Sequence, residues 1–141
     1  MATIIQIADA VVAQLNAATL SQPLTAARLY APSFELPDME TLHVTVVPRG
    51  IASTSLDRKR DSFSYDIDLA VQKKSDMAQA SLDALMTLVE EIADHFRAEP
   101  LSSFPGARCV DVKNVPVYSQ EHLDELRQFT SVLTLTFRMA R

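Results

Sequence analysis

The spacing of apolar residues changes within one stretch of the chain, residues 62–97, and the change marks two adjoining elements. In residues 63–71 every second residue is apolar and most residues between them are polar, which predicts a β-strand with one buried face. In residues 82–96 the apolar residues instead recur every three or four positions, which predicts a long amphipathic helix over about residues 76–97. Because each element has one apolar side, we expect the helix to pack on the sheet that contains the strand.

The long helix is expected to begin near Asp76 and to turn a defined face to the strand. Asp76 is suited to cap a helix, and Gln79 three residues later would complete a capping box. The apolar residues expected to meet are Leu85, Val89, Ile92 and Phe96 on the helix and Phe63, Tyr65, Ile67 and Leu69 on the strand.

A second amphipathic helix is predicted near the N-terminus, over about residues 4–18. Its apolar residues fall at helical spacing, and Thr3 is the candidate N-cap. Pro23 lies beyond its end, because proline cannot continue a helix. The segment from Ala26 to Tyr30 is then predicted to form a short strand.

The strand predicted at residues 42–47 carries valine on both faces, which is typical of a strand inside a sheet. We expect residues 48–50, Pro-Arg-Gly, to end this strand and residues 51–61 to form a long polar hairpin loop. Loops of this length in compact domains are commonly functional or disordered. We therefore expect loop 51–61 to be poorly ordered in an isolated subunit and to become fixed on assembly.

The C-terminal part predicts two more strands and a short helix. Residues 108–117 are predicted as a strand interrupted near Lys113, Ser119 is expected to open a helical turn, and residues 128–139 alternate as a last strand. The outer face of the last strand is rich in threonine and valine, without the charged coat of a fully exposed sheet. The element order predicts an α+β fold, with a mostly antiparallel sheet of four to five strands, in one domain over residues 1–141.

The composition fits a folded protein, because 141 residues with 48% hydrophobic residues can form one domain core. The formal net charge of −5 argues against polyanion binding by the molecule as a whole. The single cysteine, Cys109, cannot form a disulfide within one chain, which is typical of a reducing cytoplasm. The sequence has neither a signal peptide pattern nor an apolar stretch that could cross a bilayer, so we expect a soluble protein without membrane association.

The sequence contains no recognisable catalytic, cofactor or metal site. The three histidines, His43, His95 and His122, lack the spacing to other ligands that zinc sites use. Only two glycines are present, which excludes a P-loop or a dinucleotide-binding fingerprint. Cys109 has no histidine near it in the sequence and is expected to be a buried structural thiol. We therefore expect no cofactor and no metal ion.

Two charged clusters leave more than one interpretation open. Asp66 and Asp68 share the polar face of their strand and could form an acid pair, although a solvated face or a contact with a neighbouring subunit is favoured. Arg58, Lys59 and Arg60 are either a solvated loop tip, which is favoured, or a contact for phosphate or an acidic protein. No aromatic residue lies beside this basic run, so sequence-specific recognition of nucleic acid is not expected.

Five segments follow one another in a characteristic order: residues 4–15, 42–48, 63–73, 82–96 and 131–137. In pattern, order and length, over nearly the whole chain, they resemble the tail terminator and tail-completion proteins of long-tailed bacteriophages and prophages. Members of that family have an α/β or α+β fold and form a hexameric ring that caps the finished tail tube and offers a docking surface to the head. The resemblance implies a structural protein at the head-proximal end of the virion tail, assembled in the host cytoplasm, without catalytic residues.

The same resemblance implies a set of partners. They are further copies of the chain in a ring, the tail tube protein, a head-completion or neck protein, and the sheath protein if the tail is contractile. Arg58, Lys59 and Arg60 would then meet DNA non-specifically in the channel or contact an adjoining ring. Two alternatives stay open: a head-completion or other neck protein of the same virion, and a small cytosolic enzyme or ligand-binding module.

Overall fold

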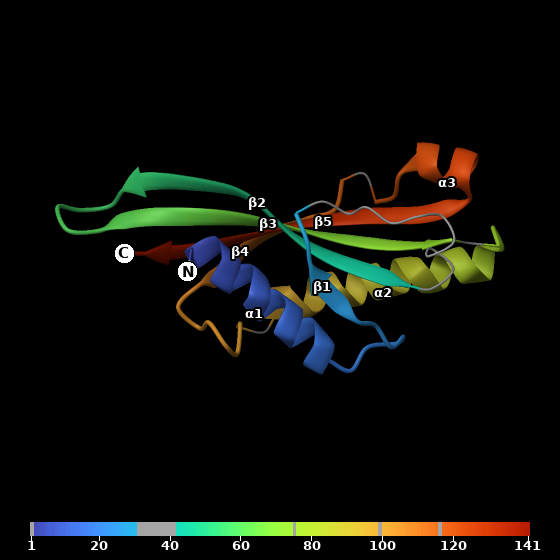
Figure 1. Ribbon diagram of the computed structural model, residues 1–141, viewed down its shortest axis with the longest axis horizontal. Helices are drawn as coiled ribbons and strands as arrows, with labels where there is room; N and C mark the ends of the chain where they lie inside the picture. The colour runs from blue at the N-terminus through green and yellow to red at the C-terminus, as the bar shows by residue number, and fades with distance from the viewer. Residues whose placement is uncertain (1, 31–41, 75, 99, 116) are drawn as a thin grey trace.

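The structure is a computed structural model that describes residues 2–30, 42–74, 76–98, 100–115 and 117–141. Within these residues the chain forms three helices and five strands (Figure 1). In chain order they are α1 (Thr3–Ala17), β1 (Ala26–Arg28), β2 (His43–Ser55), β3 (Asp61–Lys74), α2 (Gln79–Ala98), β4 (Arg108–Lys113), α3 (Gln120–Leu126) and β5 (Gln128–Ala140).

The five strands form one sheet in the order β1-β2-β3-β5-β4, so β3 is the central strand. β1 pairs with β2 in parallel, and the pairings β2–β3, β3–β5 and β4–β5 are antiparallel. The predicted α+β fold with a mostly antiparallel sheet is confirmed. The alternating stretch, residues 63–71, lies within the central strand as its pattern indicated.

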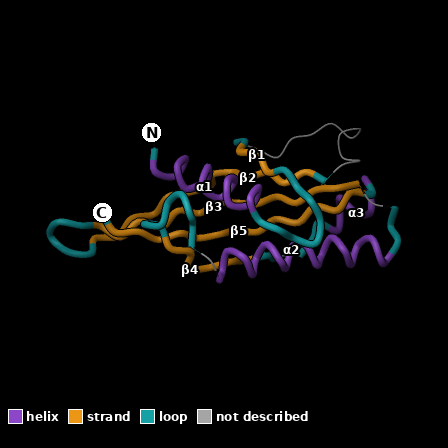
Figure 2. The backbone as a smooth tube through the Cα atoms, turned by 90° about the horizontal axis from the view of Figure 1, so that it is seen from below, coloured by secondary structure: helices purple, strands orange, loops and turns teal. Residues whose placement is uncertain are grey.

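Helices α1 and α2 cover one face of the sheet, and α3 lies on the opposite face (Figure 1). α1 contacts β1 and β2, whereas α2 contacts β4 and β5. Figure 2, turned to the helix side, shows each of these two helices along its own half of the sheet. Together, α1 and α2 therefore cover the apolar face of the central strand β3.

The predicted meeting of the helix face and the strand face is found in the core. Buried residues in one cluster include Leu85, Val89, Ile92 and Phe96 of α2 together with Tyr65, Ile67 and Leu69 of β3. Phe63 lies half-buried at the margin of this cluster, with its ring centroid 6.1 Å from that of Tyr65. The buried face of β3 is thus a continuous apolar row that ends at Phe63.

Both predicted N-caps are wrong, by one residue in α1 and by about two in α2. In α1 the N-cap is Ala2, which makes no side-chain cap, and Thr3 is already helical. In α2 the helix begins at Gln79, because Met77 has a φ of 67°, in the left-handed region that a right-handed helix cannot include. Asp76 instead accepts a hydrogen bond from the Ala78 N–H at 2.9 Å, so it stabilises the turn before the helix.

The predicted hairpin loop over residues 51–61 is wrong, because β2 continues to Ser55 and only residues 56–60 form the turn. The Leu29 N–H donates to the Val46 carbonyl, so the backbone of Val46, and two residues later that of Pro48, faces the β1 side. Since β1 has already ended there, Pro48 removes no ladder hydrogen bond. The register then shifts between Pro48 and Gly50, and strand pairing resumes at Gly50 opposite Asp66.

In the C-terminal part the strand predicted over residues 108–117 is shorter than expected. β4 ends at Lys113, and the Asn114 side chain then donates to the Ser131 hydroxyl at 2.9 Å instead of continuing the ladder. The predicted cap at Ser119 is confirmed, because its hydroxyl accepts from the His122 N–H at 3.3 Å at the start of α3. β5 matches the predicted last strand to within one residue.

Candidate functional site

The candidate residues Arg58, Lys59 and Arg60 lie at the tip of a projecting β-hairpin. We call this projection the arm and define it as residues 49–64 together with residues 137–141 at the end of β5. In Figure 1 the arm extends beyond the helices at the end of the molecule where the C-terminus lies. Every residue from 51 to 60 is exposed, so the arm presents its surface rather than burying it.

Pairing with β5 supports the arm almost to its tip. The Asp61 N–H donates to the Arg141 carbonyl at 2.8 Å, and the Arg141 N–H donates back to the Asp61 carbonyl at 2.9 Å. The Arg141 guanidinium also lies over the ring of Phe63, 4.3 Å from its centroid. The arm is therefore three-stranded up to Asp61, and only the turn at residues 56–60 extends beyond the third strand.

Asp57 organises the turn at the tip of the arm. Its Oδ1 accepts hydrogen bonds from the backbone N–H groups of Lys59 at 2.8 Å and Arg60 at 2.9 Å. Its Oδ2 lies 3.2 Å from the Arg60 Nη2, so Arg60 is already paired within the turn. Among the described residues Arg58 and Lys59 make no ion pair. The structure thus brings the three predicted contact residues together but leaves two of them as unpaired charges.

The order of this turn is expected to depend on pH. Hydrogen bonds from the backbone N–H groups of Lys59 and then Arg60 lower the pKa of the Asp57 carboxyl. A lowered folded-state pKa means that the stabilisation is present above the ordinary Asp pKa and is lost as pH falls through the lowered value. We expect the Lys59 and Arg60 amide resonances to shift toward random-coil positions over that acidic range, as measured by nuclear magnetic resonance.

The matched control for this titration is Asp57→Asn, which keeps an acceptor oxygen but has no proton to gain. Its Lys59 and Arg60 amide resonances should not titrate in the acidic range. If both proteins titrate alike, a group other than Asp57 controls the turn.

The arm and the rest of the chain differ in charge. The arm contains six arginine or lysine residues and two aspartates, whereas the rest of the chain contains seven basic and sixteen acidic residues. The net charge of −5 therefore averages a basic projection and a strongly acidic remainder. Because such opposite regions attract each other between molecules, the arm is a candidate contact for an acidic surface.

The open face of the sheet carries Asp66 and Asp68, and each of them is satisfied by a threonine of β5. The Thr136 hydroxyl donates to Asp66 Oδ1 at 2.8 Å, and the Thr134 hydroxyl donates to Asp68 Oδ1 at 2.8 Å. The Arg49 Nη1 also lies 3.7 Å from Asp68 Oδ1. These separate partners are the arrangement of a polar sheet face rather than of two carboxylates that share a proton, and they explain the threonines in the last strand.

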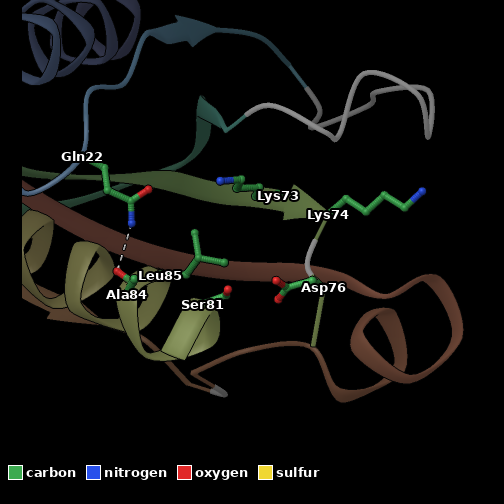
Figure 3. Close-up of a pocket in the computed structure, with 7 residues that line it drawn as sticks. All are labelled: Gln22, Lys73, Lys74, Asp76, Ser81, Ala84 and Leu85. Atoms are coloured by element: carbon green, nitrogen blue, oxygen red, sulfur yellow. Dashed lines mark hydrogen bonds between the residues drawn. The ribbon is translucent and has the colours of Figure 1, made fainter. Parts of the chain in front are cut away.

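One open pocket of the described chain lies between β3 and α2. The pocket in Figure 3, of about 470 Å³, is lined by Gln22, Lys73, Lys74, Asp76, Ser81, Ala84 and Leu85. The Gln22 side-chain amide donates a hydrogen bond to the Ala84 carbonyl at 3.2 Å (Figure 3). The Lys74 side chain points away from the pocket into solvent (Figure 3). Across the described residues no three His, Cys, Asp or Glu side chains are grouped to hold a metal ion. Within the same residues no helix is long and apolar enough to span a membrane.

The remaining chemistry-bearing residues lie apart, and two histidines have structural partners. The His95 ring nitrogen Nε2 is 3.2 Å from the Gln14 amide nitrogen, and the His122 Nδ1 is 2.9 Å from the Thr130 hydroxyl. Cys109 is half-buried on β4 rather than fully buried as expected. Burial raises the pKa of the Cys109 thiol, so little reactive thiolate is present at neutral pH.

Comparison with known proteins gives a structural match without a sequence match. No protein-family model and no curated protein matches the sequence. Among solved structures, the fold resembles the sheath/tube terminator of an extracellular contractile injection system, PVC, in its extended state. The TM-score is 0.52 at 17% sequence identity, and the likeness covers all of this chain and 57% of that one. The chain thus spans a little over half the length of that terminator and shares its fold.

Proposed function

We propose that this protein is a structural tail terminator that assembles as a hexameric ring on the end of a tail tube and has no enzymatic activity. The observation that carries the proposal is the likeness of the whole chain to a sheath/tube terminator, which agrees with the class that the sequence pattern suggested. The satisfied carboxylates of the sheet face and the raised pKa of Cys109 agree with a non-catalytic role.

The proposed tube partner follows from this likeness, and the proposed neck partner and virion position follow from the resemblance of the sequence pattern to phage tail terminators. The ring would contact the tail tube on one side and a head-completion or neck protein on the other, at the head-proximal end of a phage or prophage virion assembled in the host cytoplasm. Because the similar structure terminates a sheath as well as a tube, we include a sheath protein among the partners. A neck protein of the same particle is the second candidate. A small enzyme or ligand-binding module is the third, and it would use one of the open pockets.

Within such a ring the arm tip would contact either a neighbouring protein ring or DNA in the channel. DNA would meet Arg58 and Lys59 as phosphate-neutralising groups without base specificity. We favour the protein contact, because Asp57 already pairs with Arg60 and weakens the positive field of the tip.

Replacing Arg58, Lys59 and Arg60 together with alanine should leave the subunit folded, because all three side chains are exposed. An exposed ion pair contributes only about 0.2–1 kcal/mol, but a ring repeats it in every subunit. We therefore expect at least about a tenfold loss in head–tail joining or DNA retention, measured by complementation of a deletion. Full infectivity of the triple variant would mean that the tip is only solvated.

The control for the triple variant is Arg97→Ala, which removes an exposed basic residue of α2 outside the arm. This variant should complement as well as the unaltered protein does. An equal loss in both would attribute the effect to total charge rather than to the arm tip.

The terminator proposal itself is tested by co-sedimentation with tail tubes assembled from purified tube protein of the same gene cluster. We expect sub-stoichiometric binding, because a terminator occupies tube ends and not tube walls. A stable monomer with no affinity for tubes would favour the ligand-binding alternative instead.

A further inference from the structure

A pocket of about 210 Å³ lies between α2, α3 and the start of β5, at the end of the molecule opposite the arm (Figure 1). We call it the α2–α3 pocket. It is lined by Gln79, Leu82, Asp83, Met86, Tyr118, Leu123 and Phe129. Five of these seven side chains are apolar or aromatic, and the other two are polar. The lining therefore suits an apolar group that has a polar or charged neighbour.

The α2–α3 pocket exists because β4 ends early on this side of the sheet. β4 pairs with β5 only at residues 134–138, so residues 128–133 of β5 have β3 on one side and no described strand on the other. The Asn114 side chain donates to the Val132 carbonyl at 2.8 Å, and the Ser119 N–H donates to the Thr130 carbonyl at 2.8 Å. These two hydrogen bonds hold the segment before α3 along the edge of β5, so the pocket lies between α3 and α2.

The pocket separates α3 from the main core. Phe129 is fully buried in the core cluster, and the ring of Tyr118 lies against it with the two centroids 6.4 Å apart. Leu82 and Met86 of α2 pack against the same cluster but are only partly buried. Leu123 of α3 is buried, yet among the described residues it is not a member of that cluster. One further apolar side chain placed here would contact both α3 and the core.

The volume of the pocket limits what it can hold. In another protein, a cavity of about 150 Å³ lined by Leu, Ile and Phe side chains binds benzene. The volume of about 210 Å³ is therefore enough for one aromatic ring or one leucine-sized side chain. Pockets that bury a drug-sized ligand measure about 300–1,000 Å³. Met86 can adapt its shape to an entering ring, because a thioether side chain is flexible and makes favourable contacts with aromatic rings.

Both helices beside the pocket are acidic. Over residues 79–94, α2 carries four acidic residues and neither lysine nor arginine. α3 carries three acidic residues and neither lysine nor arginine, and a single basic residue, Arg127, follows it as its C-cap. Asp83 belongs to the lining itself and makes no ion pair with any described residue. Lys73 and Lys74, at the end of β3, line the separate pocket of Figure 3.

We propose that the α2–α3 pocket is a docking site for a different protein, which inserts one aromatic or leucine-sized side chain from a segment that carries lysine or arginine on both sides of it. The apolar lining receives the inserted side chain, and Asp83 with the acidic residues of α2 and α3 attracts the flanking charges. Interfaces commonly concentrate their binding energy in one such anchor within a pocket. The inference goes beyond the proposed ring and does not depend on it, because it concerns a site within one subunit.

The test uses the peptide probe Gly-Lys-Ser-Phe-Ser-Lys-Gly and follows the methyl resonances of Leu82, Met86 and Leu123 by nuclear magnetic resonance. We expect these resonances to shift saturably, with a dissociation constant on the order of 1 mM or lower. A probe with alanine in place of phenylalanine should bind at least about tenfold more weakly, because it lacks the apolar anchor. A probe with glutamate in place of both lysines should bind at least about threefold more weakly.

The variant Asp83→Lys reverses a charge at the pocket without changing the core, because Asp83 is exposed. It should weaken binding of the lysine probe at least about threefold and remove the preference for lysine over glutamate. The matched control is Glu90→Lys, which makes the same change of charge at an exposed position of α2 that does not line the pocket. This control should bind the lysine probe within about twofold of the unaltered protein.

Five results would overturn the inference. The first three are the absence of any saturable shift up to about 5 mM probe, equal binding of the phenylalanine and alanine probes, and equal weakening by Asp83→Lys and Glu90→Lys. Benzene that binds as tightly as the lysine probe would instead indicate a site for small apolar ligands. Self-association of the protein that the probe abolishes would assign the pocket to a second copy of this chain. All five are measured on the protein alone, so none of them depends on whether it caps a tube.

Discussion

Replacing Ile92 with alanine is expected to lower the free energy of unfolding by about 2–5 kcal/mol, the range for large-to-small changes in a core. Ile92 lies on the inner face of α2, is fully buried, and belongs to the cluster that contains Tyr65 and Ile67. Its loss removes apolar contacts on the half of the sheet that α2 covers and leaves a cavity that the surrounding strands cannot fill. Urea denaturation monitored by circular dichroism measures the change.

The control for Ile92 is Glu90→Ala on the exposed side of the same helix. It should change the free energy of unfolding by no more than about 0.5 kcal/mol, as surface substitutions usually do. A loss well under 1 kcal/mol for Ile92→Ala would mean that α2 presents a different face to the sheet.

Replacing Gln14 with alanine is expected to lower the free energy of unfolding by about 1–3 kcal/mol. Gln14 is a buried polar residue of α1, and its amide oxygen accepts from the Ser102 N–H at 2.9 Å. Its amide nitrogen lies 3.2 Å from the His95 ring nitrogen on α2. The Gln14 side chain thus joins α1 to α2 and to the segment after α2. Its truncation to alanine leaves the Ser102 N–H and the His95 ring nitrogen without this hydrogen-bond partner.

Gln6→Ala is the matched control for Gln14, because Gln6 is an exposed glutamine on the same helix. In thermal denaturation, Gln14→Ala should melt at a lower temperature than the unaltered protein. Gln6→Ala should melt at almost the same temperature as the unaltered protein. Equal melting temperatures in all three proteins would show that the Gln14 contacts do not join the helices in solution.

The parts of the fold that the sequence predicts well are those whose pattern burial enforces. Residues 63–71 alternate because one face of β3 lies in the core, where a shift by one residue would expose every apolar side chain. The inner face of α2 is predictable for the same reason. The start of α2 could not be predicted from the sequence. Met77 adopts a left-handed conformation, so the helix begins after it, and no glycine at this position indicates that conformation.

The β2 part of the arm, residues 51–55, could not be predicted, because both of its faces are exposed and no burial selects an alternating pattern there. Pro48 and Gly50 resemble a strand ending, yet they lie at a register shift beyond the end of β1, where the missing N–H has no cost. A weak signal was present in Ile51 and Thr54, whose β-branched side chains favour a strand.

The candidate site could be predicted only in part. The basic run was recognisable in the sequence. The ion pair between Arg60 and Asp57, however, depends on the conformation of the turn and not on the sequence spacing alone. The charge contrast between the arm and the rest of the chain also requires the pairing of β5, since it brings Arg138 and Arg141 beside the hairpin. A single domain over residues 1–141 stays a prediction.

The central claim is that this protein caps a tube as a ring, and electron microscopy of tube ends tests it most directly. Tail tubes incubated with the purified protein should carry added density at one end, with six-fold symmetry in averages viewed along the tube axis. A ring that forms only on the tube agrees with the account, because the tube end raises the effective concentration of subunits. Bare tube ends at saturating protein, or density along the tube walls, would contradict it.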